Sequence, residues 1–293
     1  NVVRYNKDVN GFPKVERPIE NRYELNEHLA NLFESAMETL DKKLSYARYQ
    51  AIAYLKPEAA NGLYDNAELI SRSLAGIRKN GLVKRLESSF YAFQISLNNF
   101  RLANQNMIDM FNRDKVFIAP DLDINNLLEA GLSDEEIEEK LNAKAEENPK
   151  NSVFKAEDFD PEYFELLQQD QEILEKLYKE WEGISDEDDS KFAKFNELLK
   201  HELFKTDCNP EQKLVVFSES VDTVKYLERR INRKDVLVIS ADNRSKLFKT
   251  IRENFDANYK TKLNKYNIIL TTDVLAEGVN LHRANVIVNY DTP

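Results

Sequence analysis

The sequence is poor in residues on which several classes of protein depend. Among its 293 residues there are one cysteine, seven glycines and three histidines. The single cysteine, Cys208, excludes an internal disulfide and is typical of a reducing compartment, so we expect a cytoplasmic protein. His28, His201 and His282 are far apart, and no cysteine–histidine spacing predicts a zinc site.

Long apolar runs are also missing. None approaches the roughly 20 residues that span a bilayer, and the N-terminal residues lack the basic-then-apolar pattern of a secretion signal, so we expect no membrane partner. Because the chain begins at Asn1 rather than at a methionine, we expect a piece of a longer protein. The hydrophobic fraction, 42%, suffices for one large domain or two smaller ones.

The negative charge is confined to the middle of the chain. The net charge is −11, but residues 1–120 hold 17 basic and 14 acidic side chains, and residues 191–293 hold 18 and 14. Residues 121–190 hold 6 basic and 24 acidic side chains. An acidic total therefore does not exclude nucleic-acid binding, provided that basic groups of the two ends converge on one face.

The first part of the chain has a helical pattern. Residues 1–20 contain Gly11, Pro13 and Pro18, which predict an irregular strap or linker. Apolar residues at helical spacing from about residue 23 to 54 predict one long helix or two in series. A second run, from Leu86 to Phe111, steps by three and four residues and predicts a helix packed antiparallel against the first. Such an apolar stripe is typical of a core rather than of a ligand site.

The acidic middle offers no clear site. Asp134–Glu135 resembles the acidic pair of an ATPase only superficially, since no apolar strand precedes it; Ser133 and the acids after it predict a short helix start. Residues 161–182 and 192–203 have helical spacing. The loop 186–189 between them is acidic, and we interpret it as solvated surface rather than as a metal site.

From Lys213 onward the pattern changes to short apolar runs that alternate with helical segments. Four runs predict buried strands, at 214–217, 236–239, 268–270 and 286–288. Strands that alternate with helices are typical of βαβ units and a parallel sheet. We therefore predict the α/β class: an open parallel sheet flanked by helices and preceded by an α-helical region.

Hydroxyl side chains follow three of these strands. The turns begin with Ser218 and Glu219, with Ser240, and with Thr271 and Thr272. Ligands of open parallel sheets bind outside the carboxyl ends of the strands, and hydroxyls and free N–H groups there suit phosphate oxygens. The alternative is that these residues only cap the next helices. Three such turns in one sheet favour a nucleic-acid backbone track.

Basic residues also cluster after the first strand of this region. Arg229, Arg230, Arg233 and Lys234 end the predicted helix, where positive charge complements the helix dipole. The alternative is a phosphate patch that they share with three further residues. These are Lys246, Lys249 and Arg252.

Two segments resemble conserved motifs of the superfamily-two helicases and translocases. Thr271–Asn280 aligns without a gap to the fifth motif, and Lys213–Ser220 resembles the fourth. Arg85–Ser89 resembles a segment that precedes the second lobe in Swi/Snf-like members. The resemblance implies a RecA-like second lobe over 161–293, truncated before the sixth motif. It also implies a linker from a missing first lobe (1–20), an α-helical region (21–112) and an acidic, partly mobile insertion (113–160).

The resemblance further implies roles for individual residues. The family's counterpart of Thr272 contacts the nucleic-acid backbone, and the counterparts of Gly278 and Asn280 lie beside the nucleotide. We accordingly expect Ser218, Glu219, Ser240, Thr271 and Thr272 to form a nucleic-acid track, and Glu277, Gly278 and Asn280 to line an ATP cleft. The implied cofactors of the intact protein are ATP and Mg²⁺. The implied partners are duplex DNA, bound without sequence preference, and the first lobe.

Two departures from the family matter for activity. A phosphate-binding loop ends in Gly-Lys-Ser/Thr, and none of the seven glycines is followed by lysine. The sixth motif, which carries the arginine finger, is expected beyond Pro293. We therefore expect the chain to hydrolyse nothing by itself. The alternative is a non-catalytic interaction scaffold with a RecA-like domain; a small-molecule enzyme is disfavoured, because no nucleophile–base pair can be named.

Overall fold

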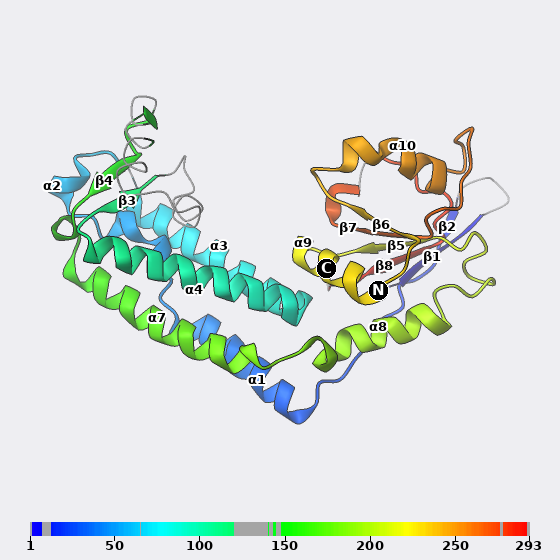
Figure 1. Cartoon of the computed structure of the whole chain (residues 1–293), viewed down its shortest axis with the longest axis horizontal. Coiled ribbons are helices and arrows are strands. Elements are labelled where there is room, and N and C mark those ends of the chain that lie inside the picture. Colours follow the sequence, from blue (N-terminus) through cyan, green and yellow to red (C-terminus); the bar gives the residue numbers. More distant parts are fainter. Residues whose placement is uncertain are drawn as a thin grey trace. The chain divides into compact units, whose positions relative to one another are not determined.

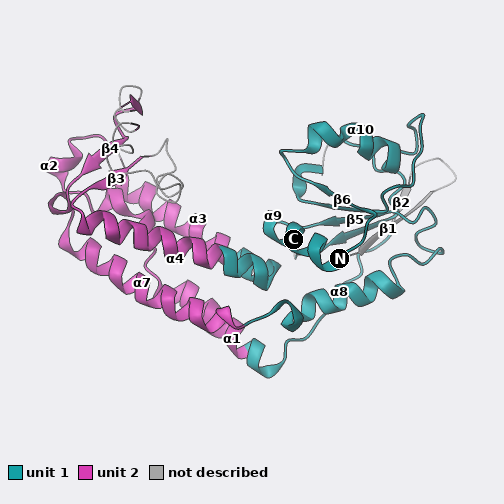
Figure 2. Ribbon diagram, in the orientation of Figure 1, with its two compact units in different colours: residues 1–30, 84–95, 184–293 teal, residues 31–83, 96–183 magenta. Residues whose placement is uncertain are grey.

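The protein is described here by a computed structural model, which covers residues 2–7, 13–64, 66–119, 140, 143–144, 148–275 and 278–291, the first two strands as backbone only. The chain divides into two compact units (Figure 2). The sheet unit comprises residues 1–30, 84–95 and 184–293, and the helical unit comprises 31–83 and 96–183. The sequence placed the start of the lobe at residue 161, whereas the contacts assign 161–183 to the helical unit.

The sheet unit is built on a six-stranded sheet in the order β2-β1-β8-β5-β7-β6 (Figure 1). Four neighbouring strands of this sheet run parallel to one another. They are β5 (Leu214–Phe217), β6 (Val236–Ile239), β7 (Ile268–Thr271) and β8 (Val286–Asn289), and each begins and ends within one residue of its predicted position. The predicted α/β class with a parallel sheet is thus confirmed. β1 (Val2–Lys7) adds antiparallel to β8, and β2 (Pro13–Val15) pairs with β1.

Helices cover both faces of this sheet because its strands are apolar on both sides. Leu214 and Val216 of β5 pack with α8 (Ser190–His201) and α9 (Val221–Ile231). Val215, between them, points to the other face and packs with α10 (Arg244–Phe255). Continuous apolar strands of this kind are expected where a parallel sheet is buried on both faces.

The helical unit consists mainly of long helices. They are α1 (Glu27–Glu38), α3 (Ala67–Ser88), α4 (Phe90–Asn112) and α7 (Pro161–Glu182), with α2 (Pro57–Ala60) as a single turn. α1, α3 and α4 also reach into the sheet unit. The short strands β3 (Val116–Ile118) and β4 (Ser152–Phe154) pair antiparallel, which brings the two ends of the acidic segment together. The predicted helix start at Ser133–Glu136 lies outside the described residues.

The structure corrects two predictions for the first part of the chain. Residues 1–20 are not wholly irregular, because β1 and β2 lie there. The helical pattern was predicted to reach about residue 54, but the helix ends with a π-helical turn at Thr39–Lys43. Only two separate 3₁₀ turns follow it, at Ala47–Tyr49 and Ala51–Ala53. The cause is a tertiary contact: the buried Asp170 carboxylate accepts hydrogen bonds from the Ser45 and Ala47 N–H groups, at 2.8 and 2.9 Å. That carboxylate holds the backbone away from a helix, and Tyr46 adopts φ of 57°.

Two further findings concern membranes and metals. No helix among the described residues is long and apolar enough to cross a membrane. Within the same residues, no group of three or more histidine, cysteine, aspartate or glutamate side chains is arranged to hold a metal ion.

Candidate functional site

The three predicted phosphate-binding turns lie at the same edge of the sheet. Phe217 of β5 is in register with Thr271 of β7, which is in register with Ile239 of β6. Parallel pairing therefore brings the next residues, Ser218, Thr272 and Ser240, to one carboxyl edge. This edge, with the turns 218–220, 240–243 and 271–273, is called the strand-end edge below.

The turn after β5 is held by the chain's last described residue. The Asp291 carboxylate accepts a hydrogen bond from the Ser218 hydroxyl at 2.8 Å and another from the Glu219 N–H at 2.6 Å. Ser218 is buried, and Ser220 caps α9 by accepting from the Thr223 N–H at 3.2 Å. For Ser220 the helix-cap interpretation is therefore correct, while the Ser218 hydroxyl has an internal partner.

The end of α3 also contacts the turn after β5. Lys84 pairs with the Glu219 carboxylate at 2.8 Å, and Arg85 donates to the Glu219 carbonyl at 3.2 Å. Just beyond, the hydroxyls of Ser88 and Ser89 lie 2.7 and 2.9 Å from that of Thr223. Arg85, Ser88 and Ser89 belong to the Arg85–Ser89 segment singled out in the sequence, and the contacts of the two serines with Thr223 fix the first turn of α9.

Lys191 on α8 connects the end of α3 with Asp291. Its ammonium donates to the carbonyls of Glu87 and Ser88, each at 2.8 Å, and lies 3.3 Å from Asp291. It also lies 4.5 Å from the centre of the Tyr290 ring. Burial lowers the pKa of the Lys191 ammonium from its usual value, and the Asp291 carboxylate partly offsets that effect. Sequence reasoning missed both Lys191 and Asp291, because neither belongs to a recognisable motif.

The other two turns differ in how open they are. Thr271 is fully buried and its hydroxyl donates to the Thr272 carbonyl at 3.0 Å. Thr272 is 9% exposed, and Ser240 is half-buried with its N–H donating to the Asn243 side chain at 2.9 Å. The exposed side chains of the three turns are therefore mainly carboxylates, those of Glu219, Asp242 and Asp273, while Ser240 is half-buried and Thr272 is buried.

Gly278, in the loop after β7, lies close to the guanidinium of Arg244. Gly278 has φ of 76°, in the region that favours glycine, and a Cβ there would lie 3.0 Å from Nη2 of Arg244 at the start of α10. Asn280 is exposed two residues further on. Glu277, the third residue predicted for the ATP cleft, lies outside the described residues. Arg244 belongs to no motif and was not predicted from the sequence.

Other predicted features prove to be structural. The histidine after this loop, His282, lies with Nδ1 3.3 Å from the buried Asp256 carboxylate. Arg229 and Arg230 form ion pairs with Asp186 and Glu187 of the acidic loop, at 2.6 and 2.8 Å. These ion pairs neutralise part of the charge of the acidic loop.

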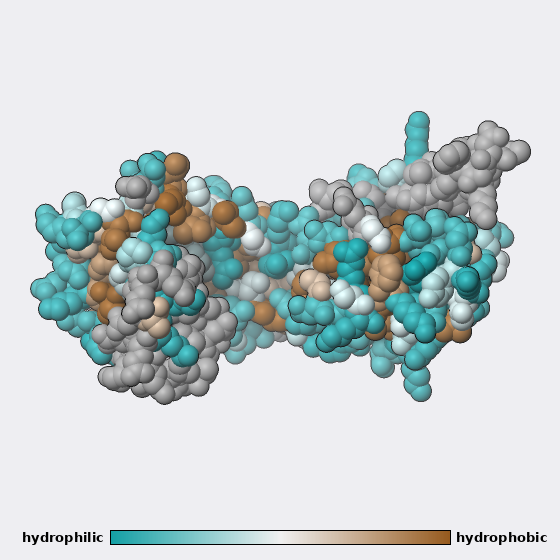
Figure 3. All heavy atoms as spheres, turned by 90° about the horizontal axis from the view of Figure 1, so that it is seen from above, coloured by the Kyte–Doolittle hydropathy of each residue, from teal (hydrophilic) through white to brown (hydrophobic). Residues whose placement is uncertain are grey.

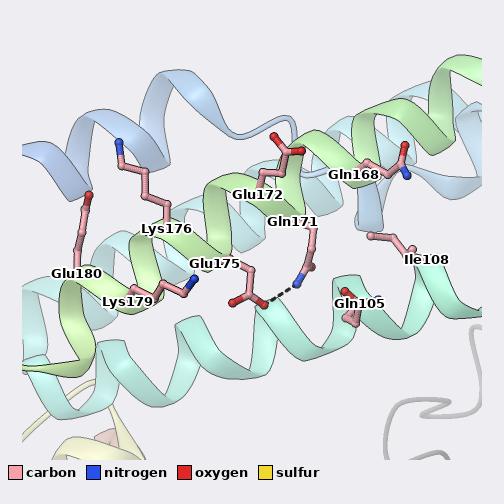
Figure 4. A pocket seen from close by; sticks show the side chains of 9 residues that line it. All are labelled: Gln105, Ile108, Gln168, Gln171, Glu172, Glu175, Lys176, Lys179 and Glu180. Carbon is pink, nitrogen blue, oxygen red and sulfur yellow. Dashed lines mark hydrogen bonds between the residues drawn. The ribbon is translucent and has the colours of Figure 1, made fainter.

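A groove of about 760 Å³ runs between α4 and α7 in the helical unit (Figure 4). Glutamine, glutamate and lysine side chains dominate its lining, and Gln171 donates to Glu175 at 3.0 Å. Glu175 also pairs with Arg101 at 2.6 Å. Its lining holds no nucleophile beside a base, so we assign it no chemistry.

The sheet unit has a clear match among known families. Residues 190–293 match the model of the helicase conserved C-terminal domain. This match covers the strand-end edge and the loop that carries Gly278, and it supports a helicase-type C-terminal lobe in this part of the chain.

Individual relatives are more distant. The chain is 28% identical over 120 residues to a Dictyostelium discoideum protein named probable ATP-dependent RNA helicase ddx51, which covers 39% of this chain. The chain spans about a fifth of that relative's length, 21%.

Two solved structures align with most of the chain at low similarity. One is the C-terminal part of the Fun30 ATPase domain, at 15% identity and a TM-score of 0.33, covering 93% of this chain and 74% of its own. The other is the Pyrococcus furiosus Hef helicase domain, at 12% and 0.34, covering 89% and 47%. With TM-scores below 0.5, neither defines how this chain is arranged.

Proposed function

We propose that the chain contributes the second motor lobe of an ATP-dependent DNA helicase or translocase of the Swi/Snf-like class. The observation that carries the proposal is the strand-end edge, where three turns rich in hydroxyls and N–H groups meet within a segment that matches a helicase C-terminal domain. ATP-driven motion against a first lobe would step the lobe along the nucleic acid in the intact, cytoplasmic protein.

In this proposal some residues of the strand-end edge contact phosphate groups and others hold the turns in place. Thr272 and Ser240 meet phosphate oxygens, together with backbone N–H groups of the turns. Ser218 and Thr271, whose hydroxyls bond internally, hold those turns in shape, and Glu219 is oriented by Lys84 and Arg85. Phosphate contacts carry no sequence information, so binding is expected to be indifferent to sequence.

The loop after β7 forms this lobe's side of an ATP cleft. A glycine backbone beside the Arg244 guanidinium fits an anionic nucleotide, which supports the assignment of Gly278, Asn280 and Glu277 to that cleft. ATP would supply the phosphoryl group and Mg²⁺ would neutralise its charge. Since no glycine of the chain is followed by lysine, the phosphate-binding loop must come from elsewhere.

The test is a fluorescence-anisotropy titration of the chain with labelled duplex DNA, duplex RNA and single strands at several salt concentrations. We expect salt-dependent binding to duplex DNA that weakens severalfold in Thr272→Ala. The matched control is Thr206→Ala, an exposed threonine in the loop before β5, which should leave the affinity unchanged.

Three outcomes would contradict parts of the proposal. Stronger binding to duplex RNA would replace the DNA assignment. Binding that Thr272→Ala does not alter would refute the strand-end edge as the track. Absence of binding to any nucleic acid at low salt would favour the alternative, a non-catalytic interaction scaffold.

A further inference from the structure

The segment between α10 and β7 is a fixed, positively charged loop. Residues 256–267 contain Lys260, Lys262 and Lys265, all exposed, and a single acid, Asp256, which is buried. This loop, called the basic loop below, leads into β7 at the edge of the sheet opposite to the strand-end edge. It is the orange segment that follows α10 in Figure 1.

The basic loop has no regular secondary structure, yet hydrogen bonds hold its backbone closely. The Asn254 side chain accepts from the N–H groups of Lys265 and Tyr266, at 2.9 and 3.1 Å. The Leu263 N–H donates to the Glu253 carbonyl at 2.7 Å. A loop tied down at so many points presents its lysines in one arrangement, which lowers the ordering entropy of binding.

A buried arginine completes this support. Arg283, 6% exposed, donates to the carbonyls of Asn254 and Leu263 at 3.0 and 2.9 Å and to the Asn264 side chain at 2.5 Å. Its remaining partner is Glu211, at 3.0 Å. Because the Arg283 guanidinium is buried and bonded to these groups, it stabilises the conformation of the basic loop and is not available to a ligand.

The lysines of the basic loop differ from the arginines around the end of α9. Arg229, Arg230 and Arg233 each pair with a carboxylate, whereas no ion pair joins Lys260 or Lys262 to any described carboxylate. In a chain of net charge −11, unneutralised lysines on a fixed loop point to an anionic partner.

Two cations of the flanking helix α10, in contrast, have carboxylate partners. Lys249 of α10 pairs with Glu253 at 3.7 Å, and Arg252 pairs with the buried Asp256 at 3.7 Å and lies 4.4 Å from the centre of the Tyr259 ring in the basic loop. Figure 3 looks down on the side where α10 lies, and hydrophilic residues predominate on this part of the sheet unit.

We infer that the basic loop binds the phosphate backbone of a nucleic acid outside the track at the strand-end edge, as a second electrostatic contact of the lobe. The inference rests on the proposed function, that the chain binds nucleic acid. The six residues from Lys260 to Lys265 span at most about 20 Å. A duplex of that length carries about 12 phosphates, enough for each lysine to meet one.

The test compares Lys260→Gln/Lys262→Gln/Lys265→Gln with the unaltered chain in anisotropy titrations with 30-base-pair duplex DNA and duplex RNA. Each lost phosphate contact reduces the slope of log affinity against log salt by about 0.9 on DNA, so we expect a slope lower by about 2–3. The matched control is Lys42→Gln/Lys56→Gln/Lys150→Gln, which removes the same charge from exposed positions of the helical unit and should keep the slope.

Lysine acetylation of the unaltered chain gives a second readout that does not depend on a variant. Duplex should protect Lys260, Lys262 and Lys265 and leave Lys42 and Lys56 reactive. Polyglutamate of equal charge serves as the probe for an acidic protein partner. Protection by polyglutamate but not by duplex would overturn the inference.

The outcomes separate this inference from the proposed function. An unchanged slope in the basic-loop variant, with binding still weakened by Thr272→Ala, would overturn the second contact and leave the strand-end edge standing. A reduced slope with no effect of Thr272→Ala would keep the basic loop and refute the strand-end edge. If no nucleic acid binds, both fail.

Discussion

Replacing Lys191 by methionine should destabilise the sheet unit strongly. The ammonium donates to two carbonyls of the α3 end at 2.8 Å and lies 3.3 Å from the Asp291 carboxylate. Methionine fills the space but leaves Asp291 without its cation and two carbonyls without a donor. Breaking a buried ion pair from one side costs about 3–5 kcal/mol, and relief of the lysine's own burial reduces this, so we expect a loss of about 2–4 kcal/mol.

Urea unfolding followed by far-ultraviolet circular dichroism measures this loss. With a slope of about 2 kcal/mol per M, the midpoint should fall by about 1–2 M. Trp181, the only tryptophan, lies in the helical unit, so its fluorescence shows whether that unit unfolds at the same midpoint.

Two further variants control the Lys191 experiment. Lys194→Met on the same helix breaks only an exposed pair with Glu197 and should cost less than about 1 kcal/mol. In a double-mutant cycle, Lys191→Met and Asp291→Asn should be coupled by about 1–3 kcal/mol. A loss no larger than that of Lys194→Met, or a coupling near zero, would refute the view that Lys191 holds α3, α8 and Asp291 together.

Two other predictions concern single sites. Gly278→Ala should lower the free energy of unfolding by about 1–2 kcal/mol, because the positive φ and the nearby Arg244 both oppose a side chain. Gly76→Ala should raise the free energy of unfolding by about 0.5–1 kcal/mol, because Gly76 lies within α3 and a Cβ there meets open space. Thermal unfolding would contradict this if both variants shifted alike. Burial lowers the pKa of Lys213 to about 8, from a usual value of 10.5, so the unfolded chain binds more protons between these values. Its contribution to stability should therefore rise with pH between about 8 and 10.5, by up to about 1.4 kcal/mol per pH unit, and Lys213→Met should flatten that rise.

The parallel sheet could be predicted because its strands carry their signal locally. The runs at 214–217 and 236–239 are apolar at every position, as strands covered on both faces must be, and their observed bounds are the predicted ones. The helical part was predicted less well, since its helix ends depend on contacts between distant residues. Asp170, 125 residues from Ser45, ends the first helical region, and no local pattern reveals that pairing.

The candidate site shows the same division. The register of the strands follows from a parallel sheet, so the meeting of Ser218, Thr272 and Ser240 at one edge could be expected from the sequence. The internal bonds of Ser218 and Thr271 could not, because they depend on Asp291 and on the local backbone. Lys191 and Arg283, which support the edges from within, look like ordinary surface cations in the sequence.

The most direct test of the central claim is hydrogen–deuterium exchange of the chain with and without duplex DNA. We predict slower exchange of the backbone amides in the turns 218–220, 240–243 and 271–273, with Thr206 and its neighbours unchanged. Protection confined to the helical unit, or none in these three turns under conditions where the duplex is bound, would contradict the claim that the strand-end edge holds the nucleic acid.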